Sequence, residues 1–108
     1  MKYLITQTEF EELLGKQPLS SYDVLPNLTI ILFTAMWCGP CKRINLDLLE
    51  SKFPANWLKC DIDQNDYTAG YCGIRSIPTF MVIYKTKIVD TKSSSNTEEI
   101  IAWLDRHV

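Results

Sequence analysis

This sequence has no long apolar run, no cluster of basic residues and only one histidine. A helix that crosses a membrane needs about 20 consecutive apolar residues, so we expect none here. The net charge of −2, without a basic cluster, makes nucleic acid and anionic membranes poor default partners. The first residues, 1–6, turn polar too soon for a secretory signal, so no export signal is expected either.

The single histidine also limits metal binding. Structural zinc takes four Cys or His ligands that converge on one point, but only Cys38 and Cys41 have the close spacing of a ligand pair, and His107 lies at the tail. Asp61, Asp63 and Asp66 have a spacing that resembles that of metal ligands, yet the glycine and the distal glutamate of a calcium loop are missing. We interpret these aspartates as solvated turn residues and expect no metal site.

The residues that are present indicate one globular domain. The chain has 108 residues, of which 46% are hydrophobic and 22% are charged, which suits a single core. Extended apolar segments alternate with amphipathic ones, and this order predicts an α/β sheet flanked by helices on both faces. Strands are predicted over 2–6, 28–35, 57–62, 79–84 and 88–91, and helices over 8–14, 38–52 and 65–72 and from 96 or 97 onward.

Two further local predictions concern connections. The segment 16–27 contains two prolines and two serines and is predicted to be an irregular loop. Its apolar side chains are expected to cover an edge of the sheet: Leu19, Tyr22, Val24 and Leu25. A tight turn is predicted at Thr86-Lys87, although no glycine is available there.

Cys38 and Cys41 lie where a predicted buried strand ends and a predicted helix begins. Unpaired N–H groups and the helix dipole favour negative charge at that point, and such a setting lowers the pKa of a thiol. Cys41 is about one helical turn further on, within reach of a mixed disulfide formed by the first sulfur. Gly39 lets the backbone approach a partner closely, and Pro40 suits the first helical turn. The pattern predicts dithiol–disulfide chemistry.

Three segments together resemble the thioredoxin family. The stretch Trp37-Cys38-Gly39-Pro40-Cys41, between a strand and a helix, is similar to the active site of that family. Residues 71–80 resemble the stretch around the family's cis-proline, and residues 59–65 resemble its central strand and the turn that follows. The resemblance covers most of the chain from about residue 28. It implies one thioredoxin domain over residues 1–108, with a mixed sheet of four to five strands.

The resemblance also implies a function and its reacting groups. The chain would be a thiol–disulfide oxidoreductase, a monomer that reduces protein disulfides, carries electrons and is reduced by a thioredoxin reductase. The lack of a visible export signal, together with the Cys38-x-x-Cys41 pair, indicates a reducing compartment, the cytosol. Its disulfide would be the only redox group, with no other cofactor. Cys38 would be a partly exposed nucleophile, and Cys41 a deeper thiol that begins protonated and then releases the substrate.

The substrate-binding residues follow from the same resemblance. Trp37 would shield the thiol and offer a flat contact, and Gly39 and Pro40 would lie next to the partner. Pro78 would be cis, and the backbone of Ile77 would pair with an extended substrate segment. From the residues alone, Trp37 is equally consistent with a core aromatic and Pro78 with a proline at the start of a strand.

Several positions depart from the family pattern. The family's buried aspartate is replaced by Leu32, whereas the lysine that partners it corresponds to Lys59. We therefore expect proton transfer from Cys41 to use water or Lys59 itself. Leu46 replaces a proline that kinks the helix in the family, so a straighter helix is expected. A glycine near the substrate groove is replaced within Ser93-Ser94-Ser95.

Two alternative functions stay open at this point. One is a non-catalytic thioredoxin-like subunit of a larger assembly, and the other is a glutathione-coupled or isomerase-like relative on the same fold. Cys60 is predicted to be a thiol in the core. Cys72 is predicted to be exposed near the active-site face, where a secondary redox or dimerisation role would be open to it.

Overall fold

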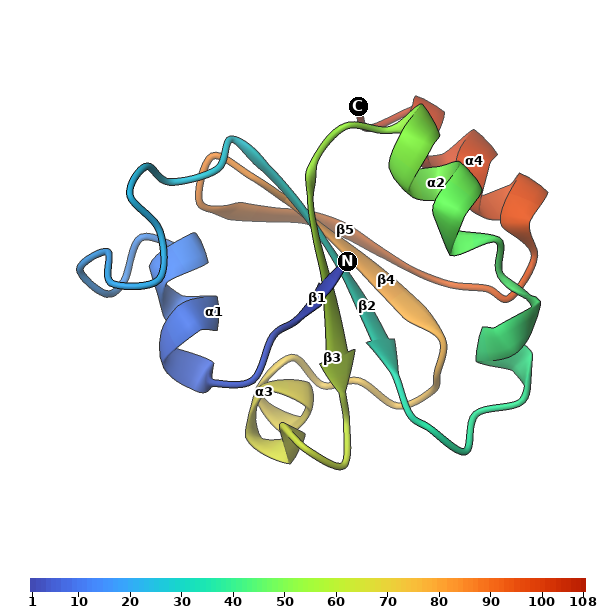
Figure 1. Cartoon of the computed structure of the whole chain (residues 1–108), viewed down its shortest axis with the longest axis horizontal. Coiled ribbons are helices and arrows are strands. Elements are labelled where there is room, and N and C mark those ends of the chain that lie inside the picture. Colours follow the sequence, from blue (N-terminus) through green and yellow to red (C-terminus); the bar gives the residue numbers. More distant parts are fainter.

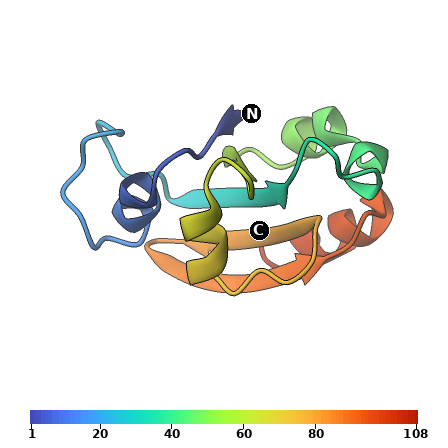
Figure 2. The same cartoon turned by 90° about the horizontal axis from the view of Figure 1, so that it is seen from below.

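The computed structural model describes residues 1–108 and shows a sheet between two pairs of helices (Figure 1; Figure 2). The five strands are β1 (Lys2–Tyr3), β2 (Leu28–Thr34), β3 (Asn56–Asp61), β4 (Thr79–Tyr84) and β5 (Lys87–Ser93). The helices are α1 (Gln7–Leu13), η1 (Pro40–Arg43, a 3-10 helix), α2 (Leu46–Lys52), α3 (Asp66–Tyr71) and α4 (Thr97–Asp105). The predicted α/β class and mixed sheet are confirmed, although β1 is shorter than expected.

The sheet has the strand order β1-β3-β2-β4-β5. Strands β1, β3 and β2 run parallel, whereas β4 is antiparallel to β2 and β5 is antiparallel to β4. In this register Leu32 lies beside Lys59 on one side and Phe80 on the other, and Thr34 lies beside Asp61. The central strand β2 therefore leads directly from the middle of the sheet to the cysteine pair.

Side chains of β2 alternate between two cores. Ile30 and Leu32 face the core under α2 and α4, whereas Ile31 and Phe33 face the core under α1 and α3. Because helices cover both faces, every one of these positions is apolar and buried. None of the helices has both the length and the apolar character that crossing a membrane requires.

The helix starts are set by side-chain caps. Asn65 caps α3, where that helix was predicted to start, and Asn96, one of the two predicted starts of the last helix, caps α4. The cap of α1 is Thr6, two residues before Thr8, where the helix was predicted to start. Thr6 has an extended backbone, and its hydroxyl accepts a hydrogen bond from the N–H of Glu9 at 3.1 Å. The Thr-x-x-Glu pattern of a capping box occurs twice in this stretch, which explains the shifted prediction.

The single helix predicted over residues 38–52 is wrong. Ile44 is extended (φ −79°, ψ 130°) and separates η1 from α2. Asn45 then caps α2, because its side-chain oxygen accepts a hydrogen bond from the N–H of Leu48 at 3.1 Å. The N–H of Asn45 donates to the hydroxyl of Thr97 on α4 at 3.0 Å. The break at Ile44 and Asn45 therefore forms with no proline at that point, and the straighter helix does not form.

The connections differ in part from their predictions. The segment 16–27 is irregular, but only Tyr22 and Leu25 pack on the core, while Leu19 and Val24 are exposed. Glu12 holds this loop by accepting hydrogen bonds from the N–H and hydroxyl groups of two of its serines. The β4–β5 hairpin turns one residue earlier than predicted, at positions 85 and 86, where φ is 47° and 72°.

Candidate active site

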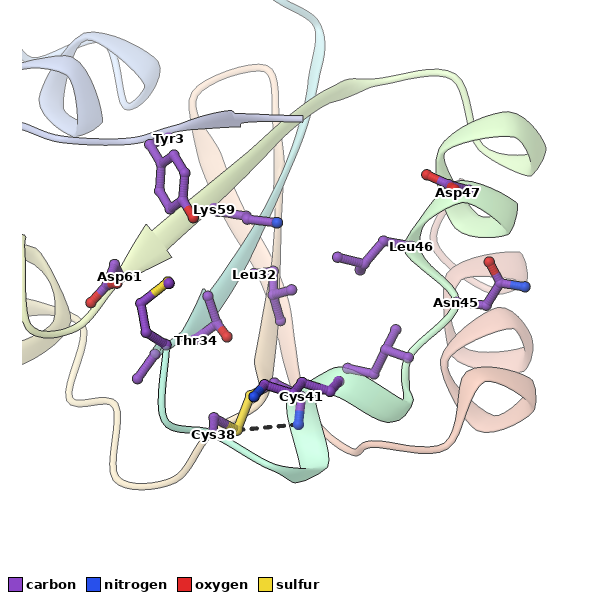
Figure 3. A pocket seen from close by; sticks show the side chains of 14 residues that line it. Tyr3, Leu32, Thr34, Cys38, Cys41, Asn45, Leu46, Asp47, Lys59 and Asp61 are labelled. Atoms are coloured by element: carbon purple, nitrogen blue, oxygen red, sulfur yellow. Dashed lines mark hydrogen bonds between the residues drawn. A yellow bond between two sulfur atoms is a disulfide. The ribbon is translucent and has the colours of Figure 1, made fainter.

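Cys38 and Cys41 form a disulfide just beyond the carboxyl end of β2 (Figure 3). The sulfurs are 2.10 Å apart and the Cα atoms 5.4 Å apart. The chain turns after β2 through a hydrogen bond from the N–H of Cys38 to the carbonyl of Ala35 at 3.1 Å. Cys41 lies in the first turn of η1, and its N–H donates to the sulfur of Cys38 at 3.2 Å. An amide of the helical turn therefore points at the first sulfur, which the sequence pattern predicts.

Both cysteines are buried in this oxidised form. Cys38 is 2% exposed and Cys41 is 8% exposed, so the expectation of a partly exposed Cys38 and a deeper Cys41 is wrong here. The pair forms a small cluster with Ala35, and Ile62 and Ile77 pack against that cluster. These two half-buried isoleucines cover the sulfurs. A partner must contact or displace this apolar cover before it reaches Cys38.

Trp37 lies outside the core. The side chain is 66% exposed, and its indole N–H donates to the carboxylate of Asp63 at 2.8 Å. The core interpretation of this tryptophan is therefore wrong. The bond to Asp63 fixes the indole beside the disulfide, where it presents a flat apolar surface.

Gly39 and Pro40 are also exposed at this surface. Gly39 has an ordinary right-handed backbone (φ −62°, ψ −51°), and a Cβ built on it would have no atom within 4 Å. The fold of the chain itself does not need a glycine there.

The Ile77–Pro78 peptide bond is cis, as the family resemblance implied. Pro78 is buried immediately before β4, while Ile77 lies against the disulfide cluster. The hydroxyl of Thr79 donates to the carbonyl of Ser76 at 2.7 Å and lies 2.7 Å from the hydroxyl of Ser93. These contacts join the Pro78 segment to the end of β5, so the three-serine segment borders it.

A pocket of about 530 Å³ opens beside the disulfide (Figure 3). One wall consists of alternate residues of the three parallel strands, which point to the same face of the sheet. The other wall comes from the end of β2 and from η1 to the start of α2. The lining side chains are Tyr3, Leu32, Thr34, Ala35, Met36, Cys38, Cys41, Lys42, Ile44, Asn45, Leu46, Asp47, Lys59 and Asp61. Leu32 is 1% exposed, so the floor of this pocket is apolar.

Two charged side chains enter the pocket from β3. Lys59 is half-buried, with its ammonium nitrogen 5.8 Å from the ring centroid of Tyr3, and it extends over the pocket in Figure 3. Asp61 is 4% exposed, and one of its oxygens accepts hydrogen bonds from the N–H groups of Asp63 at 2.8 Å and Gln64 at 3.4 Å. The interpretation of Asp61 as a solvated turn residue is therefore wrong. The sequence did hold a signal for this position, because Asp61 is two residues after Lys59 on the same strand and such residues point to the same face of the sheet.

Cys60 and Cys72 lie in the other core, under α1 and α3. Cys60 is fully buried, as predicted, and burial raises the pKa of its thiol to about 12. Cys72 is half-buried rather than exposed, and burial raises the pKa of its thiol to about 11. Both thiols are protonated at neutral pH, so neither is a ready nucleophile. No three His, Cys, Asp or Glu side chains are grouped so as to hold a metal ion.

Known proteins share both the sequence pattern and this geometry. The family profile described as Thioredoxin matches residues 3–106. The chain belongs to the thioredoxin family. It is 35% identical over 86 residues to Thioredoxin 2 of Chlorobaculum tepidum, across 75% of this chain and 79% of that protein. It is 37% identical over 83 residues to a thioredoxin of Geodia cydonium, across 74% and 72% of the two chains.

Solved thioredoxin structures have the same fold. The X-ray structure of Fasciola hepatica thioredoxin superposes with a TM-score of 0.82 at 30% identity, over the full length of both chains. The oxidised mitochondrial thioredoxin 3 of Saccharomyces cerevisiae also gives 0.82, at 25% identity, over 98% of this chain and 94% of that one. Family membership and the Cys38–Cys41 disulfide together make this chain a thiol–disulfide oxidoreductase that acts on protein disulfides.

Proposed function

We propose that this thioredoxin-family chain is a protein-disulfide reductase and electron carrier in which Cys38 attacks and Cys41 resolves. The observation that carries this assignment is the hydrogen bond from the N–H of Cys41 to the sulfur of Cys38. An amide hydrogen aimed at a sulfur favours its negatively charged form. Cys41 receives no such bond, and its side chain borders the apolar floor of the pocket.

The reaction exchanges two electrons between two sulfur pairs. The thiolate of Cys38 attacks one sulfur of the substrate disulfide, and the other substrate sulfur leaves as a thiolate that takes up a proton. Cys41 then loses its proton and attacks the sulfur of Cys38, which breaks the mixed disulfide and releases the second substrate thiol. The substrate disulfide is reduced by two electrons, and the chain is oxidised to the Cys38–Cys41 form.

The surface around Cys38 suits an extended polypeptide as substrate. Trp37 supplies an exposed flat contact, and Gly39 and Pro40 leave room for a close approach. Ile77, next to Pro78, lies against the disulfide and has backbone groups that would pair with a substrate strand. In this proposal the five residues bind the segment that flanks the substrate cysteine.

The proton of Cys41 leaves through the pocket. Leu32 on β2 lines this pocket together with Cys41, and its apolar side chain cannot accept a proton. Lys59 enters the same pocket from the neighbouring strand position. We therefore assign the acceptance of this proton to water in the pocket, with Lys59 supporting the transfer by its positive charge as the Cys41 thiolate forms.

A carrier of this kind works with two classes of partner. Disulfide-containing proteins accept its electrons, and a thioredoxin reductase returns them to the disulfide of the chain. The proposal needs no bound cofactor, because the two sulfurs hold both electrons. It also places the chain as a monomer in a reducing compartment, namely the cytosol, where a pool of reductant keeps the dithiol form available.

Insulin-disulfide reduction tests the assignment. Wild type is expected to be active, and Cys38→Ser is expected to be inactive and unable to trap substrate. Cys41→Ser is expected to accumulate a mixed disulfide on Cys38, because the second step is blocked. A trapped substrate on Cys41 in Cys38→Ser would reverse the two roles. Wild-type activity no higher than either variant would favour the non-catalytic subunit instead.

Recycling and proton transfer need separate measurements. Oxidised protein is expected to be reduced by a thioredoxin reductase and not by glutathione alone, and the opposite result would favour the glutathione-coupled alternative. For the proton, Lys59→Met is expected to slow release of trapped substrate below pH 8, whereas Lys59→Arg keeps the positive charge and the wild-type pH profile. An unchanged profile in Lys59→Met would remove Lys59 from the mechanism.

A further inference from the structure

The break between η1 and α2 depends on a residue far away in the sequence. The N–H of Asn45 donates to the hydroxyl of Thr97, 52 positions later, at 3.0 Å. In a continuous helix that N–H would bond to the carbonyl four residues earlier, at Cys41. Here the carbonyl of Cys41 instead accepts from the N–H of Ile44, a 3-10 contact that closes η1. The hydroxyl of Thr97 thus binds the N–H of Asn45, the group that would otherwise bond to the carbonyl of Cys41 and continue the helix.

Thr97 is itself fixed in place. It is the first residue of α4, directly after the cap residue Asn96. The side chain of Ser94 donates to the carboxylate of Glu99 at 2.7 Å and accepts from the N–H of Asn96 at 3.0 Å. The loop before Thr97 is therefore ordered by its own hydrogen bonds, and it starts at Ser93 beside the Pro78 segment. Thr97 joins this loop to the segment that holds the cysteines.

We infer that Thr97 is a positioning residue for the disulfide couple: its hydroxyl holds the helix break at Asn45 and so limits the number of aligned amides behind Cys38. The inference rests on the proposed function, in which Cys38 is the thiolate. A helix stabilises an anion at its N-terminus through the aligned peptide dipoles of its first turns. η1 has four residues and ends at the break, so few dipoles align with Cys38.

The direction of the effect follows from this arrangement. If the break closes, η1 and α2 merge, more amides align with Cys38, and the thiolate form of the reduced protein becomes more stable. A couple whose reduced form is stabilised is a stronger oxidant. Loss of the Thr97 hydroxyl is therefore expected to move the thiol–disulfide equilibrium toward the dithiol. Dipole effects of this type correspond to about a two- to fivefold change in an equilibrium constant.

The test compares matched variants in a dithiothreitol redox buffer at pH 7. Thr97→Val removes the hydroxyl with little change in shape, and Thr97→Ser keeps it. Thr91→Val makes the same substitution at an exposed threonine on β5, far from the break in sequence. The fraction of oxidised chain, read by alkylation and mass spectrometry, gives the equilibrium constant. We expect a two- to fivefold shift for Thr97→Val, and wild-type values for Thr97→Ser and Thr91→Val.

A second background isolates the hydrogen bond. Asn45→Pro removes the N–H donor, and both the φ of Asn45 (−84°) and the extended Ile44 before it are compatible with proline. In this background Thr97→Val is expected to have no effect, because the hydroxyl no longer has a donor to hold.

Each outcome has a defined meaning. Equal constants for Thr97→Val and Thr91→Val overturn the inference. An equal shift in Thr97→Ser, or a persistent shift in the Asn45→Pro background, overturns it too, because the hydroxyl bond would not be the cause. A wild-type protein that does not exchange with the thiol buffer at all would refute the proposed function instead.

Discussion

Replacing Leu32 by aspartate, the residue that the family has at this position, tests whether the floor of the pocket is apolar and closed to water. Leu32 is 1% exposed and belongs to an apolar cluster of eleven buried residues. Truncating a buried leucine costs about 2–5 kcal/mol, and an unpaired buried carboxylate adds a further penalty of several kcal/mol. Because a domain has only about 5–15 kcal/mol of stability, Leu32→Asp is expected to unfold at a far lower urea concentration than wild type.

The pH dependence separates the charge from the lost volume. Burial raises the pKa of a carboxyl group, so the folded form of Leu32→Asp binds more protons than the unfolded form above about pH 4. Its stability therefore falls as pH rises, by up to about 1.4 kcal/mol per unit. Leu32→Asn has the same shape and no titration. Lys59 enters the same pocket, and its positive charge is expected to reduce the slope, so adding Lys59→Met should steepen it.

Urea titrations of the oxidised proteins at pH 4.5, 6 and 8 provide the measurement. The gap in unfolding free energy between Leu32→Asp and Leu32→Asn is expected to be small at the lowest pH and to widen steadily. Parallel stabilities across this range would mean that water reaches position 32 freely, and the reasoning about an apolar floor would be refuted.

Four other changes have clear expected outcomes. Thr86→Gly relieves a left-handed turn residue and should raise the unfolding free energy by about 1 kcal/mol over Thr86→Ala. Gly39→Ala should stabilise the fold by about 0.4–1 kcal/mol while lowering kcat/KM for insulin; an unchanged kcat/KM would contradict the close approach. Backbone hydrogen bonds from two loop serines lower the pKa of Glu12, so its stabilisation is present above about pH 4.3 and is lost as pH falls through the lowered value. Amide hydrogen exchange in the loop 16–27, corrected for intrinsic rates, should therefore be faster at pH 3 than at neutral pH in wild type. Glu12→Gln should not show this pH dependence. With a thiol pKa of about 11, Cys72 is roughly 0.1% thiolate at pH 8. Iodoacetamide should therefore label Cys72 at least 100-fold faster in urea than in the native protein, and native Cys60 should be labelled even more slowly than native Cys72.

Much of the fold could be predicted because local rules agree with the tertiary structure. β4 was predicted with its observed bounds, and the caps at Asn65 and Asn96 follow directly from residue type. The break at Asn45 could not be predicted, because its decisive partner is the hydroxyl of Thr97 on another element. Residues 41–52 include several good helix formers and no proline or glycine, so periodicity alone favoured one long helix.

Some features of the site could likewise be predicted from the sequence, and others could not. The cysteine pair and the cis peptide bond before Pro78 agree with the motif. The burial of Cys38 could not be predicted, since it depends on Ile62 and Ile77, which reach the disulfide from two other loops. The burial of Asp61 was missed because it stands next to turn residues, although its strand register places it in the pocket.

The residues that surround the cysteine pair lie on loops that are separate from the strand leading to the pair. β2 and β3 are parallel and β4 is antiparallel to β2. The carboxyl ends of β2 and β3 and the start of β4 therefore lie at the same end of the sheet. Cys38 follows β2, Asp63 follows β3, Pro78 precedes β4 and Ser93 ends β5 beside it. The residues around the disulfide thus come from several different loops at that end of the sheet. We therefore expect that a substitution in one loop, such as at the three serines 93–95 at the end of β5, alters the surface near the disulfide while β2, which leads to the cysteines, keeps its register.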